Sequence, residues 1–402
     1  MTDTELLFNP FEPGFTDDPY PVYRRMRTAD PVHQHPYGFW FLTEYEDVAA
    51  ILRAGLSVDE RLVTDPEFRE QYDQLSEDGM TILNRSMLDR DPPDHTRLRS
   101  LVTKVFTPRS VAALEPEITE IVDSLLDGIA GAGRVDLAGA LAFPLPFTVI
   151  SRMLGMPPTD HDRIRELSGT LVRSLEVVAD EETVRAISEA SDEIAALIRE
   201  VIAWKREHPA DDLLSALIAA EHEGDKLSDD ELIAQVALLY IAGHETTVNL
   251  IANGTVALLR NPDQLALLRA RPELAGNAVE EFLRYDSPVQ QTRRVTVAPH
   301  VVRGKEIPAN TFVIACLGSA NRDERFWGED ADLLRIDRAD ARQHVSFGAG
   351  PHHCLGAALA RLEGRVAIER LVGRFPDLRF DGDVEWNGRM NLRGPAKLPV
   401  AV

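Results

Sequence analysis

Cysteine is nearly absent from this chain, with only two in 402 residues. Two thiols cannot form the disulfide framework on which small secreted proteins depend, and their scarcity fits a reducing compartment. No stretch of about 20 apolar residues occurs, and the first residues carry no basic segment followed by an apolar one. We therefore predict a cytoplasmic protein that does not contact a membrane.

Positive charge is also scarce, because 43 Lys and Arg stand against 66 Asp and Glu and leave a net charge of −23. Such a chain repels nucleic acids and anionic lipid surfaces, which excludes both as partners. Two stretches depart from this average: residues 96–114 contain no acid, and residues 338–374 contain six arginines against three acids. They form either a docking face for an acidic protein or solvated helix faces, and the sequence leaves both open.

Repeats, low-complexity tracts and Gly/Ser-rich linkers are lacking as well, so no domain boundary is marked. Length alone favours two or three domains. The composition, 44% hydrophobic and 27% charged, is that of an ordinary globular protein. Near the N-terminus, residues 32–35 and 39–42 flank Pro36-Tyr-Gly38, which predicts a β-hairpin.

One cysteine lies in a glycine-rich stretch, Phe347-Gly-Ala-Gly-Pro-His-His-Cys-Leu-Gly356. A helix-forming run follows it, so we expect the Cys354 thiol at a helix N-terminus. There the helix dipole and the free N–H groups stabilise a thiolate. Gly350 and Gly356 allow the backbone to pass close to a flat, bulky ligand, and Phe347 is expected to pack beneath that ligand.

Two other interpretations of this stretch stay open. The first is that Cys354 is a small buried residue that only packs, as a lone cysteine most often is. Cys316, which ends an apolar segment, is interpreted in that way. The second is a zinc site that includes nearby histidines, although consecutive His-His-Cys does not match the usual ligand spacings. The histidines concerned are His344, His352 and His353.

A long buried helix is predicted from the capping box Ser228-Asp-Asp-Glu231 to Arg260, where Asn261-Pro262 stops it. About 32 residues make it roughly 48 Å long. Residues 232–241 are almost wholly apolar. A helix with such a middle must be buried on most sides.

This helix is interrupted by Ala242-Gly-His-Glu-Thr-Thr247. An interior glycine costs about 1 kcal/mol and threonine is a poor helix former, while an unpaired carboxylate in a core is costly. When several local rules of helix stability and burial are broken at one place, they indicate a functional site. We interpret it as a groove at Ala242 and Gly243 beside an acid–alcohol pair, Glu245 and Thr246, that relays protons. The alternative is a kink in which threonine hydroxyls bond back to carbonyls.

A third candidate follows the double proline Pro92-Pro93. His95 and Arg99 are four residues apart, so they share one face of the helix predicted there. Together they can hold a carboxylate or another anion. A simple surface pair is the alternative.

The cysteine pattern Phe-Gly-x-Gly-x-His-x-Cys-x-Gly resembles the haem-binding loop of the cytochrome P-450 family in its soluble bacterial form. The Ala-Gly-x-Glu-Thr segment is similar to the oxygen-binding helix of that family. The resemblance implies a mainly α fold with small β-sheets (α+β), in a single domain over residues 1–402. Haem is then expected between the long central helix and the helix after the cysteine. Glu281 and Arg284 match the family's structural Glu-x-x-Arg pair, with Arg338 as a third member.

The resemblance also implies the cofactor and its contacts. Haem b is expected, with the Cys354 thiolate as axial iron ligand. Four residues are expected to neutralise the propionates, namely His95, Arg99, Arg294 and His352. The other expected cofactor contacts are Ala242, Gly243, Phe347, Gly350 and Gly356.

The implied activity is that of a monooxygenase that activates O2 and hydroxylates or epoxidises a small-to-medium apolar substrate. Polyketide, macrolide, terpenoid, steroid and fatty-acid substrates of secondary metabolism all fit. Glu245 and Thr246 are expected to deliver protons, and an acidic ferredoxin with its reductase to supply electrons to a monomeric enzyme. Two alternatives stay open: a peroxide-driven or redox-neutral haem-thiolate enzyme, and a non-catalytic haem-binding sensor.

Overall fold

The structure, a computed structural model, describes residues 7–63, 81–157, 161–176, 180–222 and 225–402. The chain divides into two compact units. Unit 1 consists of Met1–Leu56, Leu114–Pro146 and Glu245–Val402, and unit 2 of Ser57–Ala113 and Phe147–His244. The single domain expected over residues 1–402 stays a prediction.

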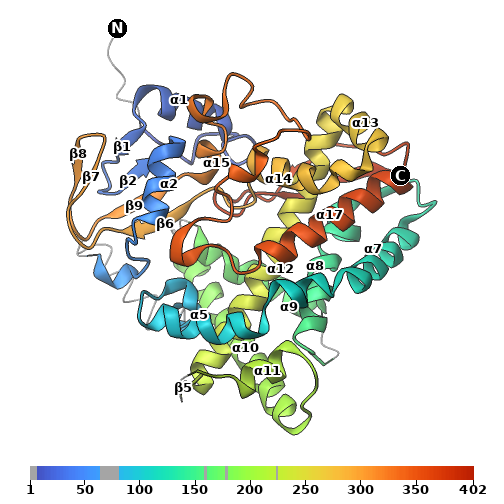
Figure 1. The fold of residues 1–402 in the computed structure, drawn as a ribbon, viewed down its shortest axis with the longest axis horizontal. Coiled ribbons are helices and arrows are strands. Elements are labelled where there is room, and N and C mark those ends of the chain that lie inside the picture. The colour runs from blue at the N-terminus through green and yellow to red at the C-terminus, as the bar shows by residue number, and fades with distance from the viewer. Residues whose placement is uncertain (1–6, 64–80, 158–160, 177–179, 223–224) are drawn as a thin grey trace. The chain divides into compact units, whose positions relative to one another are not determined.

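The largest sheet belongs to unit 1 and has the strand order β1-β2-β9-β6 (Figure 1). Its strands are β1 (Val32–Gln34), β2 (Trp40–Leu42), β6 (Thr292–Val295) and β9 (Phe312–Ala315). β2 and β9 are parallel and the other pairs are antiparallel. The predicted hairpin is therefore confirmed, with Val32 opposite Leu42. Side chains of β2 and β9 pack with Val48 and Ile51 of helix α2 (Tyr45–Arg53) into one hydrophobic cluster.

The remaining strands are short. In unit 1, β7 (His300–Val302) pairs with β8 (Lys305–Ile307), and β11 (Glu385–Trp386) with β12 (Pro395–Lys397). A three-stranded sheet orders β10 (Arg379–Phe380), β13 (Pro399–Ala401) and β3 (Arg134–Asp136). In unit 2, β4 (Glu221–His222) pairs with β5 (Asp225–Lys226).

The helices of unit 1 pack around the one that follows Cys354. Both α14 and α7 contact α17 (Figure 1). Leu250, Val279 and Ile368 are shared in one core cluster, and at Gly254 an added Cβ would lie 2.6 Å from the ring of Phe282. The helices are α1 (Tyr20–Ala29), α2, α7 (Glu115–Ile129), α13 (Pro262–Ala270), α14 (Ala275–Tyr285), α15 (Leu317–Ala320), α16 (Glu324–Trp327) and α17 (Ala357–Arg374).

Unit 2 is mainly helical. Its longest complete helix, α10, has 27 residues and begins at a cap in which the Asp180 carboxylate accepts the Thr183 N–H. Its helices are α4 (Thr81–Asn84), α5 (Asp94–Val105), α6 (Pro108–Ala112), α9 (His161–Leu171), α10 (Glu181–Glu207) and α11 (Leu213–Ala219).

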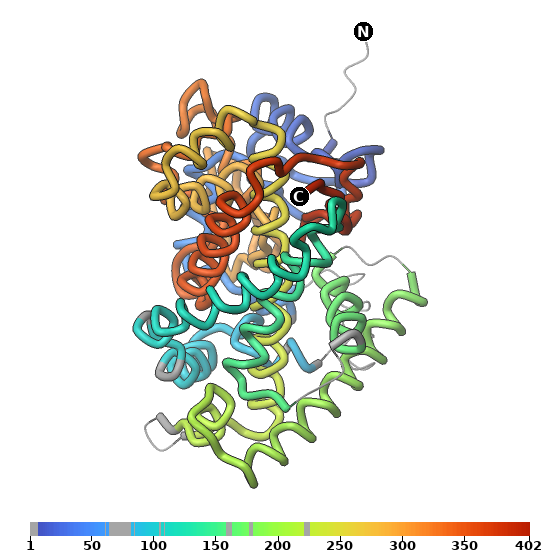
Figure 2. The backbone as a smooth tube through the Cα atoms, turned by 90° about the vertical axis from the view of Figure 1, so that its right-hand side faces the viewer, coloured from blue at the N-terminus to red at the C-terminus, as the bar shows by residue number. Residues whose placement is uncertain are grey.

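Two helices have residues in both units, α8 (Pro144–Met153) and α12 (Asp229–Arg260). The predicted long helix is confirmed in α12, which runs unbroken for 32 residues (Figure 2). Its capping box is formed as expected: the Ser228 N–H donates to Glu231 Oε2 at 2.9 Å, and the Glu231 N–H donates to Ser228 Oγ at 3.2 Å.

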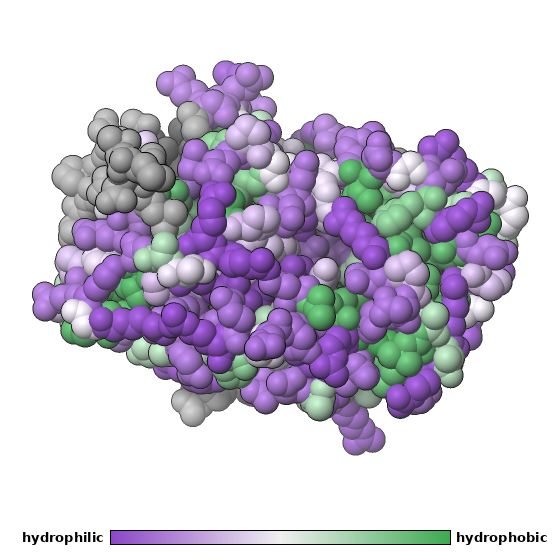
Figure 3. All heavy atoms as spheres, turned by 90° about the horizontal axis from the view of Figure 1, so that it is seen from above, coloured by the Kyte–Doolittle hydropathy of each residue, from purple (hydrophilic) through white to green (hydrophobic). Residues whose placement is uncertain are grey.

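On the face drawn in Figure 3, hydrophilic residues predominate and hydrophobic ones form separate patches. Among the described residues, no helix combines the length and the apolar character that crossing a membrane requires.

Candidate functional site

The Cys354 loop lies between a short 3-10 turn, Gly350–His352, and α17, whose N-cap is Gly356. The Cys354 N–H donates to the carbonyl of Phe347 at 2.9 Å, and this bond closes the loop. Cys354 is exposed, whereas Cys316 is buried. Cys354 thus lies near the N-terminus of a helix, as the sequence predicted, at an exposed position.

The glycines of this loop differ in what they require. Gly350 has φ +70°, and a Cβ there would lie 2.7 Å from the Leu52 carbonyl oxygen of α2. Close approach to α2 therefore demands glycine at this position, whatever else it contacts. At Gly356 a Cβ would make an ordinary 3.9 Å contact with Cys354 Sγ. Cofactor contacts at both glycines stay predictions.

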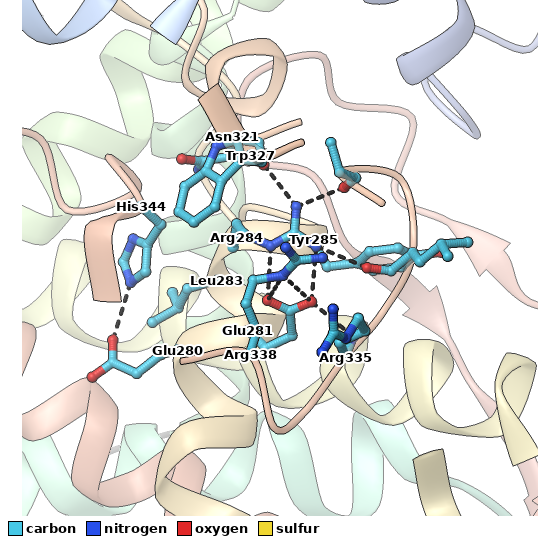
Figure 4. A network of polar contacts seen from close by, with 12 residues as sticks. Glu280, Glu281, Leu283, Arg284, Tyr285, Asn321, Trp327, Arg335, Arg338 and His344 are labelled. Atoms are coloured by element: carbon cyan, nitrogen blue, oxygen red, sulfur yellow. Dashed lines mark hydrogen bonds and ion pairs between the residues drawn. The ribbon is translucent and has the colours of Figure 1, made fainter. Parts of the chain in front are cut away.

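The start of the loop is fastened to α14 by a buried polar cluster (Figure 4). Glu280 Oε2 lies 3.1 Å from His344 Nε2, and Glu280 Oε1 accepts from Arg361 Nε at 2.9 Å. His344 Nδ1 accepts the N–H of Ser346 at 3.1 Å, so the neutral ring carries its proton on Nε2 and donates it to Glu280. The guanidinium of Arg361 stacks 4.5 Å from the ring centre of Phe347.

Ionisation in this cluster follows from burial and from these bonds. Burial disfavours the Glu280 carboxylate, but hydrogen bonds from His344 and Arg361 outweigh it and lower its pKa. Burial lowers the pKa of His344 although Glu280 opposes the shift. The pair is therefore a carboxylate and a neutral imidazole at pH 7.

The lowered pKa of His344 predicts a pH-dependent stability. Unfolded His344 takes up a proton near its ordinary pKa of about 6.5, while the folded protein binds it only at lower pH. The free energy of unfolding should therefore fall as the pH drops below that value. His344→Gln keeps an N–H donor for Glu280 without a titrating ring, so its pH dependence should be weaker.

Urea unfolding at about pH 7.5 and about pH 5.5 measures this difference. His35 and His95 also have lowered pKa values because of their burial, so some pH dependence should remain in the variant. His208→Gln, at an exposed position, is the matched control and should behave as wild type. Equal pH dependence of His344→Gln and wild type would contradict the assignment.

The zinc interpretation gains no support from the described part of the chain, where no three His, Cys, Asp or Glu side chains gather into a metal-binding group. His344 instead bonds Glu280. Haem iron takes a single cysteine thiolate from the protein, and Cys354 is an exposed cysteine beside a helix N-terminus.

The interrupted segment of α12 differs from the rest of that helix. His244 and Thr247 are fully or almost fully buried, but Ala242 is exposed, and Gly243, Glu245 and Thr246 are only partly buried. The chemically active side chains and the small residues thus lie off the packed face of the helix. The helix stays α-helical throughout.

Glu245 is paired with an arginine that the sequence did not single out. Arg389 Nη1 forms an ion pair with Glu245 Oε1, and the two side chains are 19% and 14% exposed. Arg389 lies in the segment between β11 and β12. The two residues are 144 positions apart, so neither spacing nor helix periodicity could have found the pair.

The predicted propionate contacts fall into both units. Arg294 is buried on β6 and donates from Nη1 to Thr292 Oγ1 at 3.0 Å and to the Arg293 carbonyl at 2.7 Å. His95 and Arg99 both lie on α5, as their spacing predicted. Burial and, to a lesser extent, the charge of Arg99 lower the pKa of His95. Unit 1 also holds Cys354, Phe347, Gly350, His352, Gly356, Glu245 and Thr246, while unit 2 holds Ala242 and Gly243.

The Glu281–Arg284 pair is formed and wholly buried (Figure 4). Arg284 Nε donates to Glu281 Oε2 at 2.7 Å and Nη2 to Oε1 at 2.8 Å. Its other donors reach three carbonyls, those of Asn321, Ala331 and Leu333. Arg338 lies 3.3 Å from Glu281. All three members predicted from the sequence therefore belong to one network.

The arginines of the basic stretch 338–374 form ion pairs within unit 1. Each of its six arginines pairs with an acid, including Arg365 with Glu115 at 2.7 Å. The other pairs are Arg338–Glu281, Arg342–Glu280, Arg361–Glu280, Arg370–Asp123 and Arg374–Asp127. In unit 2, Arg97 pairs with Glu231. These pairs reduce the positive charge that residues 338–374 present, and Arg97 of the stretch 96–114 is paired in the same way.

Cys316 is fully buried, and burial raises the pKa of its thiol to about 12. A thiol with such a pKa stays protonated and unreactive at neutral pH. Its interpretation as a packing residue is confirmed.

Comparison with known proteins agrees with these features. The family described as Cytochrome P450 matches residues 170–384. Cytochrome P450 107B1 of Saccharopolyspora erythraea is 45% identical, over 97% of this chain and 96% of its own. The monooxygenase PikC of Streptomyces venezuelae is 42% identical, over 96% and 91%. The solved structure of the Bacillus subtilis bacillaene synthase cytochrome PksS is 36% identical, covers 98% of this chain and 99% of its own, and superposes with a TM-score of 0.88.

Proposed function

Because the chain belongs to the cytochrome P450 family and is a monooxygenase of that family, we propose that it binds haem b through Cys354 and oxidises a small-to-medium apolar molecule. The observation that carries the proposal is the exposed Cys354 thiol before α17, in the same unit as Glu245 and Thr246 on α12. The fold is the mainly α cytochrome P-450 fold with small sheets that the sequence predicted.

The residues that hold the cofactor follow from their chemistry. Haem bound by a cysteine thiolate activates dioxygen and favours O–O bond cleavage. Cys354 Sγ supplies that thiolate. Positive or hydrogen-bonding side chains hold the propionates, and small or flat residues line the porphyrin. The first group consists of His95, Arg99, Arg294 and His352, and the second of Ala242, Gly243, Phe347, Gly350 and Gly356.

Proton delivery is assigned to Glu245 and Thr246. The Glu245 carboxylate is partly exposed, so it takes a proton from solvent and passes it on through the Thr246 hydroxyl. A carboxylate and an alcohol on an otherwise apolar helix move protons without admitting bulk water. The chain's other contribution is to orient the substrate and exclude water.

The substrate class is proposed from chemistry and from relatives. PksS is named for polyketide biosynthesis, another relative is a vitamin D(3) 25-hydroxylase, and a solved relative was crystallised with a fatty acid on its carrier protein. All of these are largely apolar molecules. We assign this chain a substrate of the same apolar kind, such as a polyketide or macrolide, terpenoid, steroid or fatty acid, hydroxylated or epoxidised in secondary metabolism.

Electrons are proposed to come from an acidic ferredoxin with its reductase, since the sequence has no flavin or nicotinamide fingerprint. Docking on the basic stretches requires the partner's acids to compete with Glu115, Asp123 and Asp127, which already pair with α17. The interaction should therefore be weak and transient. We keep a monomeric cytoplasmic enzyme as the expectation.

Thr246→Ala tests the function directly. Haem content should stay at the wild-type level, while electrons from ferredoxin and its reductase are diverted to hydrogen peroxide. Product formation should fall by about 10²-fold or more, because a positioned acid–base group contributes at least that much. Product, peroxide and consumed NAD(P)H are measured in the same assay.

Thr255→Ala is the matched control, since Thr255 is a buried threonine of the same helix whose hydroxyl donates to the Ile251 carbonyl. It should keep wild-type coupling of electrons to product. Unchanged coupling of electrons to product in Thr246→Ala would contradict the assignment of the proton relay. Product formation that is as fast with peroxide alone as with ferredoxin and its reductase would favour a peroxide-driven enzyme.

A further inference from the structure

The ion pair between Arg389 and Glu245 joins the C-terminal segment to the proposed proton relay. Glu245 is itself partly buried on α12, shortly before an unbroken run of buried residues, 247–258. A carboxylate in such surroundings is costly without a partner. Arg389 supplies the partner, and partial burial of both side chains protects the pair from full screening by solvent.

The segment that carries Arg389 is held by hydrogen bonds that do not involve Glu245. The Arg389 N–H donates to Asn387 Oδ1 at 3.0 Å, and Asn387 Nδ2 donates to the Leu392 carbonyl at 2.8 Å. The Asn387 N–H also donates to the Gly394 carbonyl at 3.0 Å. These bonds close residues 387–394 into one loop around the Asn387 side chain.

The loop is in turn fastened to its neighbours in unit 1. The Gln290 N–H donates to the Asn391 carbonyl at 2.9 Å, and the Arg393 N–H to the Pro288 carbonyl at 3.0 Å. Asn253, two turns beyond Glu245 on α12, donates to the Arg393 carbonyl at 3.1 Å. The backbone that presents Arg389 is therefore held to the same helix that carries Glu245.

We propose that Arg389 is a positioning residue of the proton relay: it holds the Glu245 side chain in the orientation from which its carboxyl passes a proton to Thr246. The inference rests on the proposed function of that pair. The Glu245 carboxylate accepts a proton from solvent while Arg389 keeps the side chain in place, and it passes a proton on toward the Thr246 hydroxyl. Glu245 is then again a carboxylate paired with Arg389, so the charge of the site is restored in each cycle.

A preset backbone makes this role effective. An arginine on a flexible chain pays side-chain and backbone entropy to hold one geometry, whereas this loop is ordered by bonds that do not involve Glu245. A group misplaced by about 1 Å costs about 10²-fold in rate. Loss of Arg389 should therefore disturb delivery through Glu245 while leaving haem attachment at Cys354 intact.

The test compares Arg389→Gln, Arg389→Lys, Glu245→Gln and the double variant Glu245→Gln/Arg389→Gln in the haem-loaded enzyme. Arg389→Gln should raise the fraction of electrons lost to peroxide by about 10-fold, within the range for a misplaced group. It should change kcat for product but not KM for substrate. Arg389→Lys keeps the charge and should restore most of the coupling.

The double variant separates positioning from a general structural role. If Arg389 acts through Glu245, the double variant should lose no more coupling than Glu245→Gln alone. Amide hydrogen exchange over residues 387–394, measured without turnover, should stay slow in Arg389→Gln because the Asn387 bonds remain. Arg379→Gln, an exposed arginine on β10, is the matched control and should match wild type in every measurement.

Each failure points to a different conclusion. Wild-type coupling in Arg389→Gln, with lost coupling in Glu245→Gln, would overturn the positioning role and leave the relay standing. Additive losses in the double variant would also overturn it. If Glu245→Gln and Thr246→Ala both kept wild-type coupling, the proposed relay itself would fall.

Discussion

Arg284→Met is expected to lower the free energy of unfolding by about 3–5 kcal/mol, the cost of removing one partner of a buried ion pair. The Arg284 and Glu281 side chains are both 0% exposed, so the variant leaves a carboxylate in the core. Arg338 lies 3.3 Å from Glu281 and compensates only part of that charge. Urea unfolding of wild type and variant measures the difference.

The control is Arg271→Met, which removes an arginine that pairs with Glu273 at 52% and 65% exposure. An exposed pair contributes about 0–1 kcal/mol, so this variant should remain close to wild type. Equal destabilisation by both substitutions would show that burial of the Glu281–Arg284 pair does not matter.

Replacing both partners by apolar residues should not restore stability here, although such swaps often do. Arg284 also donates to the carbonyls of Asn321, Ala331 and Leu333, and Glu281 accepts the Arg335 N–H at 2.8 Å. An apolar pair leaves these backbone groups buried without their present partners. The network thus organises the segment before the Cys354 loop.

Features set by neighbouring residues could be predicted from the sequence. The capping box at Ser228, the end of α12 before Pro262, and the pair at i and i+3 in α14 each depend on a few adjacent positions. Their geometry follows from helix periodicity and capping chemistry alone. The Cys354 motif belongs to the same class, because its loop closes between Phe347 and Cys354.

Features that join distant segments could not be predicted. The partners of Glu245 and Glu280 lie 144 and 64 residues away, and no periodicity links such positions. The acids that pair with residues 338–374 could not be predicted for the same reason, since Asp123 and Asp127 come from α7. Likewise the demand for glycine at 350 arises from Leu52 of α2, which the local motif does not reveal.

Cys354→Ala is expected to have the largest functional effect. The chain's other cysteine, Cys316, is fully buried and its thiol stays protonated, so it offers no second thiolate. The variant should therefore bind haem weakly or through a neutral ligand, and monooxygenase activity should fall to background. The fold should persist, because Cys354 is exposed and its N–H bond to Phe347 belongs to the backbone.

Cys316→Ala is the matched control, since it removes the other cysteine of the chain from a fully buried position. It loses some packing but no ligand. Haem content, thiolate spectrum and activity should therefore match wild type after correction for folded protein.

The carbon monoxide difference spectrum of the reduced, haem-loaded protein tests the central claim most directly. Wild type and Cys316→Ala should show the band of a thiolate-ligated haem, and Cys354→Ala should lack it. A thiolate band that persists in Cys354→Ala, or that disappears in Cys316→Ala, would contradict the assignment of Cys354 as the iron ligand.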